Sequence, residues 1–212
     1  MAKIVDRAGR VIRVLREDPG FNLYSASFSP DGLLVATVAF YSSGELGRGR
    51  VRIWDWERRE VLLTINADAM HVDFDPGGSR LATAGLDGQA EIWDVRSGTR
   101  VAVLAGNSGG ILDIAFSPDG SRVATASFDG TVRLFEADTG AQHLVLGGHG
   151  CGVDSVAFSP DGTRLASASC DGVRIWALDI DDLLEIARQN VTRSLTDEEC
   201  RQYLHVEACP ND

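Results

Sequence analysis

The sequence predicts an all-β protein assembled from repeats of roughly forty residues each. One five-residue phrase recurs, as Phe28-Ser-Pro-Asp-Gly32, Phe74-Asp-Pro-Gly-Gly78, Phe116-Ser-Pro-Asp-Gly120 and Phe158-Ser-Pro-Asp-Gly162. The four phenylalanines lie 46, 42 and 42 residues apart. Between residues 20 and 177 the 3.6-residue periodicity of helices is missing, whereas strand-sized runs recur in every repeat. Such a period, built from short strands, predicts sheets and not helical repeats.

The third repeat shows the expected strands most clearly. Its strand-sized runs are Ile111–Phe116, Arg122–Ala126, Thr131–Glu136 and Gln142–Leu146. Three short turns rich in Asp and Gly separate these runs. In the Ser-Pro-Asp-Gly turns, Pro pre-sets φ, Asp hydrogen-bonds its own backbone, and Gly supplies a positive φ. The repeat therefore predicts a four-stranded antiparallel meander.

A single meander of this kind has two apolar faces and buries them only against copies of itself. This requirement predicts a β-propeller with four sequence blades, followed by a short α-helical tail. The expected boundaries are a partial blade at 1–16, repeats at about 17–65, 66–106, 107–148 and 149–177, and the tail at 178–212.

The two ends of the repeat region complement each other. The segment Ala2-Lys-Ile-Val-Asp6 lines up with Ala90-Glu-Ile-Trp-Asp94, so the first residues are expected to form the end of a blade. The fourth repeat stops after its third strand, and residues 10–15 form a spare outer strand that would complete it. Two hypotheses follow: a homodimer that completes a larger propeller, or the C-terminal portion of a longer propeller protein.

The tail changes periodicity. Ile180, Leu183, Leu184 and Ala187 fall at helical spacing and predict an amphipathic helix. The capping box Thr196-Asp-Glu-Glu199 predicts a second short helix that ends near residue 205. The apolar stripe is expected to cover part of the propeller.

Charge and hydropathy exclude several classes of partner. The chain has 20 basic and 31 acidic side chains and a net charge of −11, which repels phosphate backbones and anionic lipids. Neither nucleic acid nor a membrane is therefore expected as a partner. The longest apolar run, Leu33–Tyr41, is too short for a membrane span. No secretory signal is visible near Met1, so a cytoplasmic location is expected.

The cysteines do not suggest a metal site. Cys151, Cys170, Cys200 and Cys209 form no CxxC pair, so the spacing of a zinc ribbon is missing. In a reducing compartment free thiols are expected. The redox state of Cys200 and Cys209 stays open.

The third strands and one histidine carry a family resemblance. These strands read Val51-Arg-Ile-Trp-Asp55, Ala90-Glu-Ile-Trp-Asp94, Val132-Arg-Leu-Phe-Glu136 and Val173-Arg-Ile-Trp-Ala177. With Gly148-His149 ahead of the fourth repeat, they resemble the WD40-repeat family of β-propellers. The resemblance implies a structural tetrad, a buried hydrogen-bond chain of His149, Ser167, Asp171 and Trp176. The equivalent offsets hold Asn107, Ile65 and Pro19, so the other tetrads are expected to be incomplete.

The whole region including the tail resembles the C-terminal WD40 part of bacterial multidomain signalling proteins. That resemblance implies a non-catalytic protein-protein interaction scaffold in signalling or regulation. Serine, histidine and aspartate in one repeat also suggest a hydrolase, but nucleophilic catalysis needs an exposed serine and an oxyanion hole. A second-strand serine faces the neighbouring blade instead. The structural interpretation is therefore preferred, and no catalytic residue, metal ligand or cofactor is expected.

The alternative function is a propeller enzyme, a hydrolase or lyase with its site at the central channel. His71 and His143 lie in expected strands, but no carboxylate pattern joins them into one site.

A candidate partner-binding rim consists of Leu86, Phe128 and Cys170, each directly before an Asp-Gly turn. In the resembling family these turns project at one rim, and apolar groups gathered there suggest a surface for another protein of unknown identity. The alternative is that each side chain is packed locally. In the first repeat residues 42–49 replace the Asp-Gly turn, and either a binding loop or an arbitrary insertion fits them.

Overall fold

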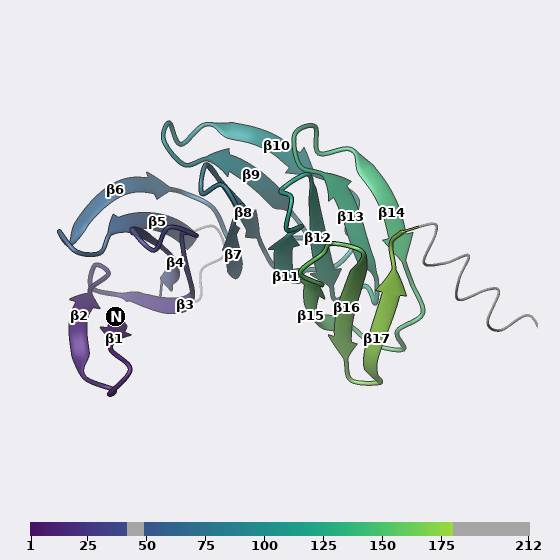
Figure 1. Cartoon of the computed structure of the whole chain (residues 1–212), viewed down its shortest axis with the longest axis horizontal. Helices are drawn as coiled ribbons and strands as arrows, with labels where there is room; N and C mark the ends of the chain where they lie inside the picture. Colours follow the sequence, from purple (N-terminus) through teal and green to yellow (C-terminus); the bar gives the residue numbers. More distant parts are fainter. Residues whose placement is uncertain (42–48, 180–212) are drawn as a thin grey trace, which may run out of the picture. The chain divides into compact units, whose positions relative to one another are not determined.

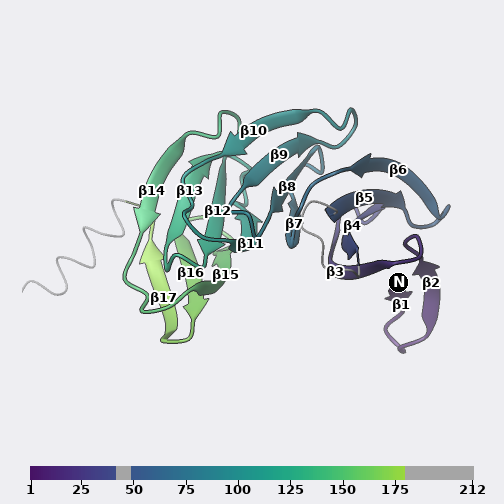
Figure 2. The same ribbon diagram turned by 180° about the vertical axis from the view of Figure 1, so that it is seen from behind.

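The structure is a computed structural model that describes residues 1–41 and 49–179. All regular elements among these residues are β-strands, grouped into antiparallel sheets whose neighbours follow the chain order (Figure 1 and Figure 2). The predicted all-β propeller fold is confirmed, while the predicted helical tail and the first-repeat loop lie outside the described residues.

Three sheets have four strands each. They are β3 (Phe21–Phe28), β4 (Leu34–Tyr41), β5 (Gly49–Asp55) and β6 (Glu60–Ile65); β7 (His71–Phe74), β8 (Arg80–Ala84), β9 (Ala90–Asp94) and β10 (Arg100–Leu104); and β11 (Ile111–Phe116), β12 (Arg122–Ser127), β13 (Val132–Glu136) and β14 (Gln142–Leu146). The two end sheets are smaller: β1 (Ala2–Val5) with β2 (Val11–Leu15), and β15 (Val153–Phe158), β16 (Arg164–Ser169) and β17 (Gly172–Ala177).

The Ser-Pro-Asp-Gly phrases form the turns between first and second strands. In the third repeat the Ser117 hydroxyl donates to Asp119 at 2.5 Å, and the Gly120 amide donates to the Ser117 carbonyl at 2.8 Å. Gly120 has φ of 71°, a left-handed conformation that glycine adopts without strain. Hydrogen bonds from the Ser117 hydroxyl and the Ser121 amide lower the pKa of Asp119 to about 2. The turn therefore holds a charged aspartate as its centre.

Consecutive sheets pack face to face through apolar side chains. Val51 and Ile53 of one sheet lie in a buried cluster with Val72, Phe74 and Leu81 of the next. A second cluster joins the β7–β10 sheet to the β11–β14 sheet in the same way. The first strands β3, β7, β11 and β15 contact one another in that order. Each sheet thus covers one face of its neighbour, and each fully buried aliphatic side chain contributes about 1.5–3 kcal/mol.

The third strands show which faces are covered. Two side chains of each point toward the following sheet, and they are buried in three sheets: Val51 and Ile53, Ala90 and Ile92, Val132 and Leu134. The equivalent residues of β17 are Val173 and Ile175, which are 69% and 62% exposed. The β15–β17 sheet therefore has one face that no described residue covers.

The N-terminal strands pack as the outer part of a blade. β1 pairs with β2 in the register Ala2↔Leu15 and Ile4↔Arg13. Ala2 and Ile4 pack on a buried cluster of Leu15, Val35 and Trp54. No described strand pairs with the other edge of β1. The first residues accordingly occupy the place of third and fourth strands in front of the β3–β6 sheet.

Contacts within the chain group Met1–Trp176 into one compact unit, and the residues that follow do not belong to it. No helix long and apolar enough for a membrane span occurs in the described part of the chain.

We predict that Leu134→Ala lowers the free energy of unfolding by about 2–5 kcal/mol, because it opens a cavity in a closely packed contact between sheets. Leu134 is fully buried, whereas its cross-strand partner Leu144 is 38% exposed and provides the matched control, Leu144→Ala. Urea unfolding monitored by tryptophan fluorescence measures both. Equal losses for the two variants would contradict the assignment of the core.

Candidate functional site

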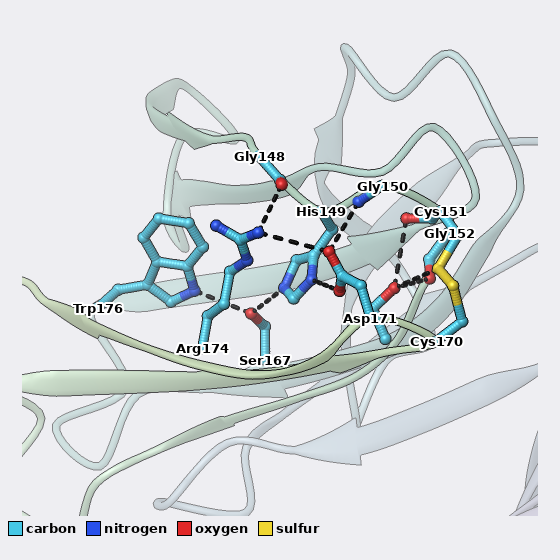
Figure 3. A network of polar contacts seen from close by, with 11 residues as sticks. Gly148, His149, Gly150, Cys151, Gly152, Ser167, Cys170, Asp171, Arg174 and Trp176 are labelled. Carbon is cyan, nitrogen blue, oxygen red and sulfur yellow. Dashed lines mark hydrogen bonds and ion pairs between the residues drawn. A yellow bond between two sulfur atoms is a disulfide. The ribbon is translucent and has the colours of Figure 1, made fainter.

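His149 and three partners form a continuous chain of hydrogen bonds in the β15–β17 sheet (Figure 3). His149 contacts Asp171 through Nδ1 at 2.6 Å and Ser167 Oγ through Nε2 at 2.8 Å. Trp176 Nε1 donates to the same Ser167 oxygen at 2.8 Å. The histidine comes from the segment before β15, while the serine, aspartate and tryptophan come from β16, the following turn and β17. The structure therefore brings together all four residues of the tetrad that the family resemblance implied.

Asp171 anchors the loop as well as the imidazole. Its second oxygen accepts the Gly150 amide at 2.9 Å and contacts Arg174 at 3.4 Å. The hydrogen bond with His149, followed by that of Gly150, lowers the pKa of Asp171 to about 2. The carboxylate is therefore charged at neutral pH, and it holds the loop before β15 against the turn before β17.

These hydrogen bonds join aspartate, histidine and serine in the order of a catalytic triad. The serine, however, is not accessible as it is in a triad. Ser167 is only 1% exposed, and the indole and imidazole both contact its hydroxyl. A nucleophilic serine must approach a substrate carbonyl beside an oxyanion hole. A hydroxyl buried between two side chains has no such approach, so these residues fasten the sheet.

The β3–β6 sheet contains a related series of hydrogen bonds, in which a carboxylate takes the place of the histidine. Glu17 accepts the Thr37 hydroxyl at 3.2 Å, and Thr37 accepts Trp54 Nε1 at 2.8 Å. Arg50 and Arg52 lie 2.7 and 3.0 Å from the nearly buried Glu17 carboxylate. Counted back from the phenylalanine, the offset of His149 falls on Pro19 in this repeat, whereas Glu17 takes the equivalent place because β3 has 8 residues and β15 has 6.

The two central sheets retain only part of this series of hydrogen bonds. In the β7–β10 sheet Trp93 Nε1 donates to Thr83 at 3.0 Å. In the β11–β14 sheet Thr125 donates to Asn107 at 3.2 Å, and Phe135 replaces the tryptophan. A second-strand hydroxyl is thus kept in each of the four sheets that have three or four strands, while its partners change.

Cys151 and Cys170 form a disulfide with a Cα–Cα distance of 6.2 Å. The expectation of free thiols was wrong for this pair: it rested on an expected reducing compartment, whereas the fold places the loop before β15 against the turn before β17, where the two cysteines are bonded. The bond joins the same two segments that His149 and Asp171 connect (Figure 3). Cys200 and Cys209 lie outside the described residues.

The three residues predicted for the partner-binding rim occupy equivalent turns of consecutive sheets. Leu86 is 45% exposed and Phe128 is 56% exposed, and Cys170 is exposed although bonded to Cys151. The Phe128 ring also lies against Gly152 of the next sheet, where an added Cβ would be 2.9 Å from the ring. Each interpretation therefore captures part of the arrangement, since Phe128 packs locally with one edge and exposes the rest.

The first strands hold a charged cluster that the sequence reasoning missed. His71 Nδ1 lies 2.8 Å from Asp113, whose other oxygen accepts the Ser155 hydroxyl at 2.7 Å and the Val156 amide at 2.9 Å. Asp73 accepts the Phe116 amide at 3.0 Å. These carboxylates link β7 to β11 and β11 to β15.

The signal for this cluster was present in the repeat. His71 and Asp113 each lie three residues before the phenylalanine of their repeat, and that offset puts them on neighbouring first strands. His143 lies elsewhere, on the outer strand β14. Among the described residues no group of three potential ligands is arranged to hold a metal ion.

The cluster perturbs three pKa values. The Asp113 carboxylate, 2.8 Å from His71 Nδ1, raises the pKa of His71, although burial opposes it. Burial raises the pKa of Asp73. Burial also acts to raise the pKa of Asp113, but the contact with His71 and the hydrogen bond from the Val156 amide outweigh it, and the pKa falls.

We predict that Ser167→Ala lowers the free energy of unfolding by about 1–3 kcal/mol, because the buried His149 and the partly buried Trp176 each lose a hydrogen-bond partner. Ser121→Ala removes an exposed hydroxyl that bonds Asp119 and should cost less. Thermal unfolding of both variants measures the difference. A loss for Ser121→Ala as large as that for Ser167→Ala would contradict the structural role of the buried chain.

The His71–Asp113 pair should stabilise the fold in a defined pH range. A histidine pKa raised in the folded state contributes stability that is fully present below the unfolded value of about 6.5 and is lost as pH rises through the folded pKa. His71→Gln should therefore destabilise the protein more at pH 6 than at pH 9. NMR titration of His71 in the wild type and in Asp113→Asn provides the control. An unchanged histidine pKa in Asp113→Asn would refute this coupling.

The comparisons with known proteins agree with the geometry. The Schizosaccharomyces pombe periodic tryptophan protein 2 homolog is 34% identical to this chain over an alignment of 119 residues. This match covers 48% of this chain and 14% of the relative. The homolog of Dictyostelium discoideum is 30% identical over 95 residues, 40% of this chain and 10% of the relative. That of Mus musculus is 30% identical over 104 residues, 47% of this chain and 10% of the relative. The matches thus span a small part of each relative.

The protein-family model described as "WD domain, G-beta repeat" matches residues 60–94, 98–136 and 140–176. Each match begins near the fourth strand of one sheet and ends in the third strand of the next, so each repeat links two sheets. The matched residues make up more than half of the sequence, and the chain belongs to the WD40-repeat family.

Proposed function

We propose that the chain is a non-catalytic scaffold that binds another protein at the rim formed by Leu86, Phe128 and Cys170. The observation that carries this proposal is the exposure of Leu86 and Phe128 at equivalent turns of consecutive sheets. Large side chains that stay exposed on a framework of buried strands are typical anchors for a partner protein. WD40 repeats and the relatives named as periodic tryptophan protein 2 homologs favour a scaffold over an enzyme.

The backbone around the rim supports the proposal because it is held in place. The Phe128 amide donates to the Gly110 carbonyl at 2.9 Å, and the Ile111 amide donates to Gly85 of the preceding sheet at 2.9 Å. The Ser108 hydroxyl donates to Asp129 beside Phe128 at 3.0 Å. Turns fixed in this way lose little conformational entropy on binding, so more of the contact energy contributes to affinity.

The partner's surface is proposed to be apolar at its centre and neutral or basic around it. The chain has a net charge of −11, and like charges at an interface slow encounter and oppose binding. A role in bacterial signalling is also proposed, on the resemblance of the tail. The relatives named above are eukaryotic and lend this finer role no support.

The alternative of an enzyme at the central channel would have to use the His71–Asp113 pair. Asp113 is already occupied by His71, Ser155 and the Val156 amide, and these contacts tie three sheets together. That occupation favours a structural role for the pair, so the scaffold remains our proposal.

The cytoplasmic location stays a prediction. The disulfide between Cys151 and Cys170 is at odds with it, because reducing compartments keep thiols reduced. In such a compartment the hydrogen bonds of His149 and Asp171 would hold the two segments without the disulfide.

Replacing Leu86 and Phe128 together with Ser should abolish capture of the partner with little change in the melting temperature, because both side chains are largely exposed and only one edge of Phe128 packs on Gly152. Val101 and Val103 on the outer strand β10 have similar exposure, and Val101→Ser with Val103→Ser is the matched control. Affinity capture followed by mass spectrometry compares the three proteins. Partners retained by the rim variant would rule this rim out as the binding surface.

A further inference from the structure

The β15–β17 sheet presents an apolar face that lacks a neighbour in the described structure. Its members are Ala157, Ala166, Ala168, Val173 and Ile175. In the β11–β14 sheet the equivalent positions include Ala124, Ala126, Val132 and Leu134, which are all buried. The uncovered face therefore has the residue pattern of a face that receives another sheet of the same kind.

The complementary face is uncovered at the other end of the repeats. Ala26 and Phe28 of β3 are exposed, and Phe28 is 50% accessible. The equivalent phenylalanines, Phe74 and Phe116, are 5% and 7% exposed because the preceding sheet covers them. The chain thus carries both halves of one more contact between sheets.

In this structure β1 covers part of the surface in front of the β3–β6 sheet. Ala2 and Ile4 pack on the cluster that contains Val35 and Trp54, while Phe28 stays open because no described first or second strand stands beside β1. Ala2-Lys-Ile-Val has the same alternation as Val173-Arg-Ile-Trp in β17. β17 therefore matches the place of β1, and it brings β15 and β16 with it.

We propose that the uncovered face of the β15–β17 sheet binds the front of the β3–β6 sheet in a second copy of this chain, with β17 replacing β1 beside β2. The exchange breaks the four-residue pairing of β1 with β2 and forms an equivalent pairing of β17 with β2. It gives the three-stranded sheet its fourth strand, and it covers Ala26, Phe28, Val173 and Ile175 together.

A second copy fits this face better than an unrelated protein because the contact continues one the chain already makes three times. The β3–β6, β7–β10, β11–β14 and β15–β17 sheets contact in series through the same positions. The two surfaces differ from each other, so the contact is head-to-tail, and each copy uses both surfaces. Neither Leu86 nor Phe128 takes part, and the contact is independent of the proposed rim.

The test is the mass of the 212-residue chain in solution, measured by light scattering over a range of concentrations. We expect twice the mass of one chain, or a higher multiple, and a return to one chain in Ile175→Lys. Ile175 is 62% exposed, so the variant should fold; Val101→Lys, at a site 43% exposed on β10, should keep the wild-type mass. A single-chain mass for the wild type, or equal losses in both variants, would overturn the proposal.

Two further measurements distinguish other occupants of the face. Ile4→Ser weakens the packing of β1 and should increase the assembled fraction; a decrease would show that β1 belongs to the contact and would refute the exchange. Hydrogen exchange of the β17 amides should slow only as the mass increases. Slow exchange at a concentration where the mass is that of one chain would mean that the chain's own residues cover β17, and would also overturn the proposal.

Discussion

The burial of each sheet's apolar face against the next sheet is the constraint on which this structure depends. A four-stranded meander with small and apolar residues on both faces cannot be stable alone, because neither face is acceptable in water. Alanines such as Ala82, Ala124 and Ala126 are fully buried in the second strands, where a small side chain lets neighbouring sheets approach closely. The energetic unit of the protein is therefore the contact between two sheets. Among the described residues, the exposed faces at β3 and β17 are the exceptions to that rule.

The hydrogen-bonded residues of the sheets reflect a second constraint, which is that buried hydrogen-bonding groups need partners. The second-strand hydroxyl is the constant member, as Ser167, Thr37, Thr83 or Thr125. The group that meets it varies from imidazole to carboxylate to amide, and sometimes it is missing. Glu17 requires two arginines because a buried carboxylate without cations would be costly. The loss of tetrad residues from the sequence is therefore in part a replacement of one hydrogen-bond partner by another.

We propose two kinds of binding surface. The rim exposes single large side chains on fixed turns, which suits recognition of an unrelated protein. The end faces expose continuous strands with the pattern of a sheet contact, which suits another sheet of the same type. The first surface would persist in any assembly, whereas the second would disappear in it. Scaffolding and self-association can therefore coexist in this chain without competition for residues.

The sequence by itself determined the fold class, the strand positions and the turns, because the alternation of apolar residues and the Ser-Pro-Asp-Gly phrases act locally. The grouping of His149, Ser167, Asp171 and Trp176 came from the resemblance to the WD40 family, because only the fourth repeat has the histidine. The tertiary structure alone decided which residues meet between different segments: Glu17 with Thr37, Cys151 with Cys170, and His71 with Asp113. It also decided that Val173 and Ile175 are uncovered although their sequence matches that of buried strands. The physical reason is that local periodicity sets which face a side chain occupies, whereas burial and pairing depend on what other segment arrives at that face.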